Sequence, residues 1–326
     1  MFISDHNNIK ASDVKEENLV DVETCGICGA KDFKKLIVYS KSPQIHFVKC
    51  DNCGAVTYDK ILNQEAIDNL YNSDAQYYKD DESKESGGNI TFYGSKRFAK
   101  HLLKKFKTNK DNDFRILDFG GGDGELAYAV ARELYRKYRY SHSDIMVVDY
   151  TNELYNTKNR KVSMYHSDSL FSNEVMEIGG ISGNEQRNAN GGYDIIIASG
   201  VIEHIPSPKE DLNQLFDLLK PGGIIYFRTP YIYPLRRDLQ RFGVEYDTLY
   251  PAHIWDLGGK WWSKLPQHVG YNGNISIISS RPSIVEKSFG SHFFIALASY
   301  VLKAPWFICH LWPYVGGWEA VYKKGK

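Results

Sequence analysis

A glycine-rich turn between an apolar run and an amphipathic stretch is the feature that most constrains how this chain can fold. The sequence LDFGGGDGEL, residues 117–126, places four glycines within five positions. The apolar run 114–119 is typical of a buried strand, and residues 125–137 carry apolar side chains at helical spacing. A strand, a glycine turn and a helix together present backbone N–H groups and a helix N-terminus to a ligand. We therefore predict a ligand site at this turn.

The sequence beyond the turn alternates between strand and helix patterns. DIMVVDY at 144–150, YDIIIAS at 193–199 and IIYFRTP at 224–230 are typical of buried strands. We expect WEAVYKK, 318–324, to be the last strand, antiparallel to NISIISS, 274–280. The alternation predicts an α/β fold: a doubly wound sheet with helices on both faces and ligands bound beyond the carboxyl ends of its strands.

Four of the five cysteines form two C-x-x-C-G pairs, Cys25 with Cys28 and Cys50 with Cys53. Two such pairs supply the four soft ligands that a tetrahedral zinc ion accepts. The alternatives are two disulfides or a redox-active dithiol, but nothing in the sequence indicates an oxidising compartment. We predict a small zinc-ribbon module with one structural zinc ion, whose four thiolate ligands leave no open position for catalysis. Cys309 stands apart, and we expect it to be a buried apolar residue.

Composition limits the classes of function that the chain can have. Its 326 residues suffice for one large domain and a smaller one. The 40 basic and 40 acidic residues give no net charge, which argues against a nucleic-acid partner. Residues 1–20 lack the apolar core of a signal peptide, and no run of about 20 apolar residues indicates a membrane span. The expected location is the cytoplasm.

The spacing of the glycine turn separates it from the dinucleotide-binding fingerprint G-x-G-x-x-G. Glu125 stands where that fingerprint has its third glycine, which disfavours a nicotinamide oxidoreductase. The turn resembles the first motif of class I S-adenosylmethionine-dependent methyltransferases, and it reads Asp118-x-Gly120-x-Gly122-x-Gly124. The resemblance continues in order through residues 114–230 and implies a Rossmann-like methyltransferase sheet.

The resemblance implies which residues hold S-adenosylmethionine. Asp149, at a strand end, corresponds to the acidic residue that binds the ribose hydroxyls, and Asp168 to the residue that accepts from the adenine amino group. The cationic sulfonium and the zwitterionic amino-acid part suit Asp118 and the turn carbonyls. The full expected cofactor set is Asp118, Gly120, Gly122, Gly124, Asp149, Tyr150, Asp168, Ser169 and Ser199.

The cysteine pairs ahead of this core resemble the layout of bacterial enzymes that methylate sugars and surface glycans. Known C-methyltransferases of this layout carry a further C-terminal domain for which this chain is too short. We therefore expect O-methylation of a sugar or sugar-like small molecule in polysaccharide biosynthesis. The loop SGVIEHI, 199–205, also lacks the Asn/Asp-Pro-Pro-aromatic motif associated with methylation of nucleobase amino groups. The alternatives are a sugar C-methyltransferase and a non-catalytic zinc-ribbon binding protein with a relic methyltransferase fold.

Methyl transfer to a hydroxyl needs a group that removes its proton, and the candidates lie beyond the fourth and fifth strands. Glu203 and His204 follow the fourth strand, and His253 lies in an aromatic insertion after the fifth. A histidine is the natural base at neutral pH, so we favour His204, then His253, over Glu203. Packing or cofactor contact is the alternative role of His204. The candidates for stacking on a sugar ring are Tyr77, Tyr78, Tyr231 and Tyr233.

These assignments divide the chain into three parts. We expect a zinc-binding module at 1–60, a helical linker on the substrate side at 61–110 and the methyltransferase domain at 111–326, with aromatic insertions at 231–262 and 283–316.

The Trp-rich segment 293–318 is apolar but too short to span a bilayer, and its aromatic residues would suit a membrane surface. The alternative is a helical pair that covers the substrate cleft or forms a dimer contact. We favour this alternative, because exposed apolar patches more often mark protein interfaces than lipid contacts.

Overall fold

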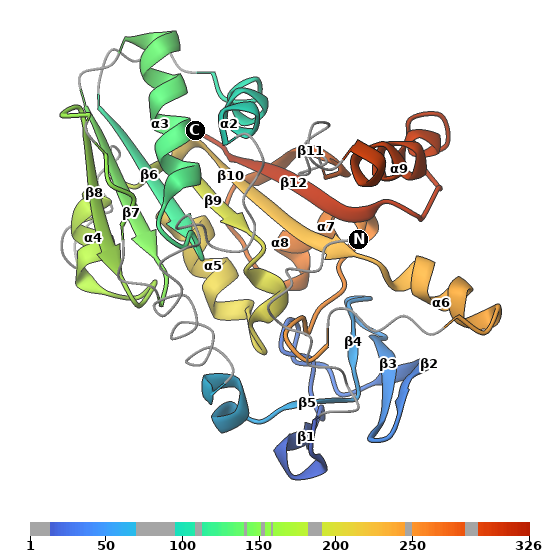
Figure 1. Ribbon diagram of the computed structural model, residues 1–326. Coiled ribbons are helices and arrows are strands. Elements are labelled where there is room, and N and C mark those ends of the chain that lie inside the picture. The colour runs from blue at the N-terminus through green and yellow to red at the C-terminus, as the bar shows by residue number, and fades with distance from the viewer. Residues whose placement is uncertain are drawn as a thin grey trace.

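The computed structural model describes residues 14–69, 95–107, 113–139, 142–150, 154–157, 159–181, 191–244, 250–283 and 293–326. Within these residues the chain forms a large α/β body and a small β-rich N-terminal module (Figure 1). The body contains the glycine turn, and the module contains the four paired cysteines.

A seven-stranded sheet forms the centre of the body and confirms the predicted doubly wound α/β class. Its order is β11-β12-β10-β9-β6-β7-β8, and β12 runs antiparallel to both of its neighbours, as predicted for the closing strand. The strands are β6 (Phe114–Phe119), β7 (Ser143–Val148), β8 (Val162–Ser167), β9 (Tyr193–Ser199), β10 (Leu219–Tyr231), β11 (Ile275–Pro282) and β12 (Gly316–Lys324).

The strand order reverses between β6 and β9, which are parallel neighbours. From β6 the chain adds β7 and β8 on one side, and then returns to the other side of β6 with β9 and β10. Ligands of such sheets bind at this reversal, outside the carboxyl ends of the strands. The glycine turn follows β6 and therefore lies at this place.

Helices cover both faces of the sheet, because most strand side chains are apolar and buried. The core on one face is formed with α2 (Ser95–Leu103) and α3 (Glu125–Tyr138). The core on the other face is formed with α4 (Asn173–Ile178) and α5 (Lys209–Leu218). This second core also includes the four paired cysteines, so the module and the body share apolar packing.

The N-terminal module consists of two small antiparallel sheets. The larger sheet pairs β2 (Phe33–Lys41) with β3 (Gln44–Cys50) and β3 with β4 (Val56–Tyr58). The smaller one pairs β1 (Leu19–Asp21), which follows the 3-10 helix η2 (Glu16–Asn18), with β5 (Lys60–Leu62). These strands account for the apolar stretches between and after the cysteine pairs.

The insertion after β10 joins the module to the body. Its helix α6 (Tyr233–Arg241) places the Arg236 guanidinium 3.8 Å from the centre of the Tyr39 ring, and Arg236 Nη2 donates to the Tyr39 carbonyl oxygen at 3.2 Å. The Asp256 N–H donates to the Val56 carbonyl oxygen of β4 at 2.9 Å. Cation–π contact and backbone pairing thus hold the insertion on the module.

Further helices in the described ranges lie in the C-terminal third of the chain. They are α7 (Gly259–Trp262), α8 (Leu265–His268), α9 (Phe293–Lys303) and the 3-10 helix η4 (Ala304–Phe307). None of the helices in the described ranges has the length and apolar character needed to cross a membrane.

Candidate active site and metal centre

The glycine turn follows the predicted strand, and three of its glycines have left-handed backbone conformations. The angle φ is 67° at Gly120, 58° at Gly122 and 82° at Gly124. A Cβ added to Gly120 would lie 2.6 Å from the Val201 side chain, and one added to Gly124 would lie 2.6 Å from Val147. Both backbone conformation and packing therefore exclude side chains here.

Asp118 lies inside the turn rather than on its surface. The side chain is buried, and Oδ2 accepts a hydrogen bond from the Ala127 N–H of α3 at 3.3 Å. Burial raises the pKa of this carboxyl group to about 7. A Cβ on Gly121 would lie 2.5 Å from its Cγ, so the carboxyl group fills the space under the turn. This geometry gives Asp118 a role in holding the turn to α3.

Asp149 lies next to the turn, at the end of β7. Its Oδ2 accepts a hydrogen bond from the Gly122 N–H at 2.8 Å, which ties the carboxylate to the glycine turn. A carboxylate has lone pairs for several donors, so this bond leaves capacity for ribose hydroxyls. Tyr150, the next residue, is exposed.

The other expected cofactor residues follow the flanking strands β8 and β9. Asp168 is exposed and Ser169 half-buried after β8, while Ser199 ends β9. The Ser199 hydroxyl is buried and has no hydrogen-bond partner in the part of the chain that the structure describes. A buried hydroxyl without a partner at the sheet reversal is suited to a polar ligand. The donor set at this edge therefore fits S-adenosylmethionine.

Three titratable side chains from two segments meet beyond β9. Glu203 and His204 lie in the 3-10 helix η3 (Ile202–His204), and His253 lies in the insertion after β10. The two imidazole rings pack edge to face, with their centroids 4.5 Å apart. One ligand atom from each of the three residues lies within 4.8 Å of the others, a donor set that could also accept a divalent cation.

Hydrogen bonding fixes the tautomer of His204. Its Nδ1 lies 3.0 Å from the Ala252 carbonyl oxygen, which can only accept, so Nδ1 carries the proton. Burial lowers the pKa of His204 to about 4, so the ring is neutral at pH 7 with its lone pair on Nε2. A neutral imidazole with a defined lone pair has the form that a general base requires.

His253 and Glu203 are also held in neutral forms. Burial, together with the nearby His204 and Arg228, lowers the pKa of His253 well below its ordinary value. Burial raises the pKa of Glu203 to about 8, although the positive charge of Arg228 opposes the rise. A protonated carboxyl group cannot accept a proton, so Glu203 is a weaker candidate than the two histidines at pH 7.

Arg228 and Asp256 are buried charged residues near this cluster that sequence reasoning missed. Arg228 lies in β10, and the Asp256 carboxylate accepts from the Ile232 and Tyr233 N–H groups at 2.8 and 2.9 Å, at the start of α6. The sequence signal for each residue is a single charge inside an apolar run, IIYFRTP for Arg228 and HIWDL for Asp256. Charged residues are seldom buried without a role, so such a charge indicates a candidate site residue.

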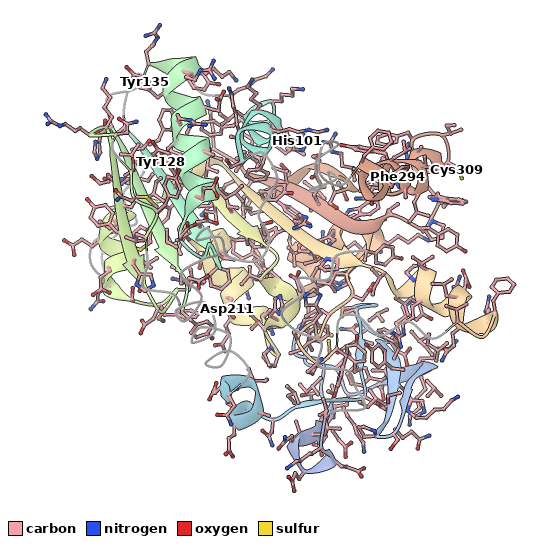
Figure 2. The ribbon with its side chains drawn as sticks, in the orientation of Figure 1. His101, Tyr128, Tyr135, Asp211, Phe294 and Cys309 are labelled. Carbon is pink, nitrogen blue, oxygen red and sulfur yellow. The ribbon has the colours of Figure 1, made fainter. Side chains whose placement is uncertain are left out.

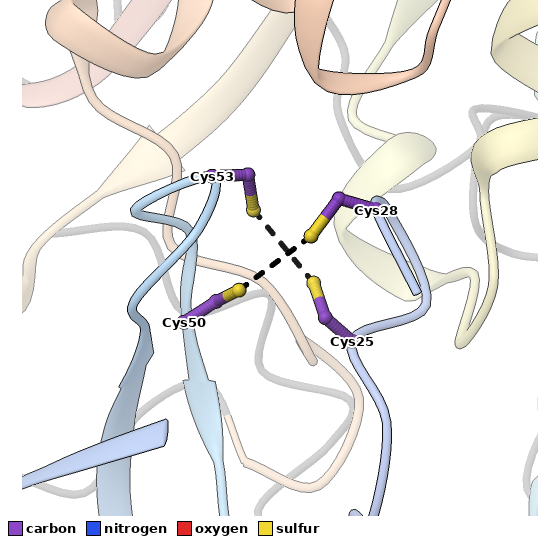
Figure 3. Close-up of side chains that lie close together, drawn as sticks. All are labelled: Cys25, Cys28, Cys50 and Cys53. Carbon is purple, nitrogen blue, oxygen red and sulfur yellow. Dashed lines mark hydrogen bonds between the residues drawn. The ribbon is translucent and has the colours of Figure 1, made fainter. Parts of the chain in front are cut away.

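The four cysteines of the module converge on one point (Figure 3). The Sγ atoms of Cys25 and Cys53 are 3.7 Å apart, and those of Cys28 and Cys50 are 3.6 Å apart. Disulfide sulfurs lie about 2.0 Å apart, so all four are thiols. A tetrahedral zinc ion with bonds of about 2.3 Å holds its sulfur ligands about 3.8 Å apart. The sulfur positions therefore fit such an ion.

The cysteine module contacts both segments that carry the histidines. A Cβ on Gly26 would lie 2.1 Å from the Pro206 carbonyl oxygen, so the first cysteine pair packs on the loop after η3. Thr57 Oγ1 donates to the Ile254 carbonyl oxygen at 2.9 Å. The Ile254 N–H in turn donates to the Glu203 carbonyl oxygen at 2.6 Å. A continuous set of contacts thus runs from β4 to the histidine cluster.

Three predictions about single residues have different outcomes. Cys309 is exposed rather than buried, because it lies in the turn after η4, so that prediction is wrong. Tyr77 and Tyr78 lie outside the described residues. Tyr231 is half-buried, which raises its pKa to about 12, and Tyr233 packs edge-on against Phe47 of the module.

The fold and the glycine-turn site define a Rossmann-like methyltransferase. Residues 93–281, more than half of the chain, match the model of a family described as a methyltransferase domain. The chain belongs to this family.

Curated relatives are methyltransferases with different substrates. A malonyl-[acyl-carrier protein] O-methyltransferase from Halalkalibacterium halodurans is 26% identical over 133 residues, 41% of this chain and 45% of the relative. An arsenite methyltransferase from Aquipseudomonas alcaligenes is 29% identical over 119 residues, 36% and 33% of the two chains. A ubiquinone biosynthesis O-methyltransferase from Bordetella avium is 28% identical over 116 residues, which are 35% of this chain and 42% of the relative. The chain thus spans less than half of the length of each.

Two of the solved structures that the chain resembles are named as methyltransferases. The plantazolicin methyltransferase BpumL in complex with SAH is 17% identical, with a TM-score of 0.43 over 81% of this chain and 90% of that one. A chain in the complex of the Haloferax volcanii Trm112 methyltransferase activator with a methyltransferase is 12% identical. Its TM-score is 0.44, over 79% of this chain and 97% of that one.

Proposed function

We propose that this protein transfers the methyl group of S-adenosylmethionine to a hydroxyl group of a small molecule. The observation that carries the proposal is the arrangement at the sheet reversal. The glycine turn and Asp149 lie at the carboxyl ends of β6 and β7, and the histidine cluster follows the adjacent strand β9. Because Val201 packs against Gly120, the loop that leads to His204 borders the turn itself.

The reaction is an in-line displacement in which the substrate oxygen attacks the methyl carbon. The carbon–sulfur bond breaks, its electron pair stays on sulfur, and S-adenosylhomocysteine leaves as a neutral thioether. The substrate proton passes to a neutral imidazole, for which His204 Nε2 is the best candidate because the bond to the Ala252 carbonyl leaves the lone pair on this atom. Holding the two reactants in line contributes much of the rate in such reactions.

We infer that the acceptor is a sugar or sugar-like hydroxyl of a glycan precursor. The cysteine-pair layout ahead of the methyltransferase core supports this substrate class. Two of the curated relatives are named O-methyltransferases, which agrees with transfer to oxygen. Methylation of a sugar carbon is the second candidate, because the same layout is found in C-methyltransferases.

We infer that one structural zinc ion occupies the four-cysteine centre. Its four thiolate ligands would leave no coordination position for substrate, so the ion would act through the fold. The contacts from Gly26 to Pro206 and from Thr57 to Ile254 give it a path to the histidine segments.

Replacing Asp149 by alanine tests the cofactor site. The variant should bind S-adenosylmethionine about 30-fold more weakly, which corresponds to about 2 kcal/mol, because hydrogen bonds to a charged acceptor are lost. Asp113→Ala is the matched control: it removes an exposed carboxylate next to the opposite end of the β6 strand. Isothermal calorimetry measures both, and equal affinities of Asp149→Ala and the wild type would remove Asp149 from the site.

Replacing Thr57 by valine tests whether the module positions the histidine cluster. The variant keeps the side-chain volume but removes the hydrogen bond to the Ile254 carbonyl, so turnover should fall about fivefold, in line with about 1 kcal/mol for a buried bond. Cofactor affinity should stay unchanged, and Thr57→Ser should restore the rate because it keeps the hydroxyl. Full turnover in a folded Thr57→Val protein would show that the contact has no positioning role.

A further inference from the structure

An exposed apolar surface covers α9, η4 and the turn that follows. Phe294, Ile308 and Leu311 are 81%, 92% and 80% exposed. Large side chains with lower exposure add to this surface, namely Phe293, Leu297, Val301 and Phe307. We call residues 293–311 the apolar segment. Exposed apolar side chains gathered in one segment usually mark a contact site.

A basic groove lies beside α2, with a volume of about 750 Å³. It is lined by Lys96, Arg97, Lys100, Lys104, Lys105 and Arg281, together with His101. Lys96, Lys100 and Lys104 are spaced four residues apart and therefore project from one side of the helix and its end. Because the whole chain has no net charge, this groove is a local concentration of positive charge.

A carboxylate balances the positive charge at the floor of the groove, whereas the lysines at its rim have no such partner among the described residues. The buried carboxylate of Glu319 accepts from His101 Nε2 at 2.8 Å and from Arg281 Nε at 2.7 Å. No ion pair joins Lys96, Lys100 or Lys104 to a carboxylate among the residues that the structure describes. The exposed rim therefore presents cations that an external anion can approach.

The groove and the apolar segment adjoin each other. Arg97 Nη2, on α2, donates to the Tyr300 hydroxyl of α9 at 2.6 Å. In Figure 2, His101 on α2 and Phe294 and Cys309 on the apolar segment lie along the same upper part of the molecule. A row of lysines thus borders a row of exposed apolar side chains.

We propose that this combined surface docks the protein onto an anionic lipid bilayer. Apolar side chains of the segment enter the interface between headgroups and acyl chains, while the lysines of α2 pair with anionic headgroups. With 11 residues, α9 is about 16 Å long and lies in the interface rather than crossing the hydrocarbon core of about 30 Å. A second copy of the chain is a less favourable partner for this surface. A two-fold symmetric dimer contact here would place the positively charged grooves of both copies next to each other, and they would repel.

Co-sedimentation of the full chain with vesicles tests the proposal. The protein should bind vesicles that contain phosphatidylcholine and phosphatidylglycerol, bind phosphatidylcholine alone much more weakly, and dissociate as salt screens the lysines. Phe294→Ser and Ile308→Ser should each weaken binding about tenfold through lost apolar burial. Lys100→Glu should weaken it about fivefold or more, as expected for removal of one cation near an anionic surface.

The matched controls lie elsewhere on the surface. Phe242→Ser alters a side chain that is 84% exposed after α6, and Lys209→Glu reverses an exposed charge at the start of α5, so both should bind as the wild type does. The proposal is wrong if the wild type binds neither kind of vesicle, or if Phe294→Ser and Lys100→Glu bind with full affinity. It is also wrong if sedimentation velocity finds a dimer that Phe294→Ser converts to monomers, because a second copy would then cover the apolar segment.

Discussion

Replacement of His204 by asparagine is expected to slow methyl transfer by about 10²- to 10⁴-fold, the contribution of a general base. The Nδ1 bond to the Ala252 carbonyl places the lone pair on Nε2, and asparagine offers no basic nitrogen at that position. Affinity for S-adenosylmethionine should be almost unchanged, because the glycine turn and Asp149 remain. Single-turnover transfer and a cofactor titration separate these two quantities.

Two further histidine variants complete this experiment. His253→Asn tests the second ring of the pair, which packs 4.5 Å from the first, and it should show a large defect if His253 relays or accepts the proton. His268→Asn is the control, since that half-buried ring of α8 stacks on Trp261 of α7. Full turnover of both His204→Asn and His253→Asn between about pH 6 and 9 would exclude a histidine base. A rate that requires an added divalent cation would assign the cluster to metal binding.

Cys28→Ser is expected to abolish metal binding at the module and to lower turnover along with stability. Structural zinc contributes folding free energy directly, on the order of 10 kcal/mol in small zinc-dependent folds, so loss of one thiolate should unfold the module. The contacts from Gly26 and Thr57 to the histidine segments would then be lost as well. Metal analysis should find about one equivalent of zinc in the wild type and much less in the variant.

Cys309→Ser serves as the control for this experiment, because Cys309 is exposed and far from the other four cysteines in sequence. It should retain zinc, thermal stability and turnover. A fully active preparation of the wild type that contains no metal would contradict a structural zinc ion.

Much of the fold could be predicted because its determinants are local. Apolar runs of strand length alternate with amphipathic stretches, and the glycine cluster marks a turn in which Gly120, Gly122 and Gly124 take left-handed conformations. The two C-x-x-C-G pairs likewise indicate their shared centre, because each pair fixes two sulfurs by local geometry. The antiparallel closing strand β12 followed from its apolar pattern and its position after NISIISS.

The arrangement around the histidines could not be predicted, because it depends on contacts between distant segments. His253 is held beside His204 by the hydrogen bond from the Ile254 N–H to the Glu203 carbonyl oxygen, and Thr57 of the module supports the same segment through the Ile254 carbonyl oxygen. The burial of Glu203 and its raised pKa also depend on this packing. Asp118 shows the same limit: its position in the motif did not reveal that its carboxyl group accepts a hydrogen bond from the α3 backbone.

Calorimetric titration of the wild-type protein with S-adenosylmethionine tests the central claim most directly. We expect saturable binding of about one equivalent per chain, with S-adenosylhomocysteine competing for the same site, as the arrangement at the strand ends of β6, β7 and β9 predicts. Absence of saturable binding to either compound, in a folded preparation, would contradict the proposed function and favour a binding protein with a relic methyltransferase fold.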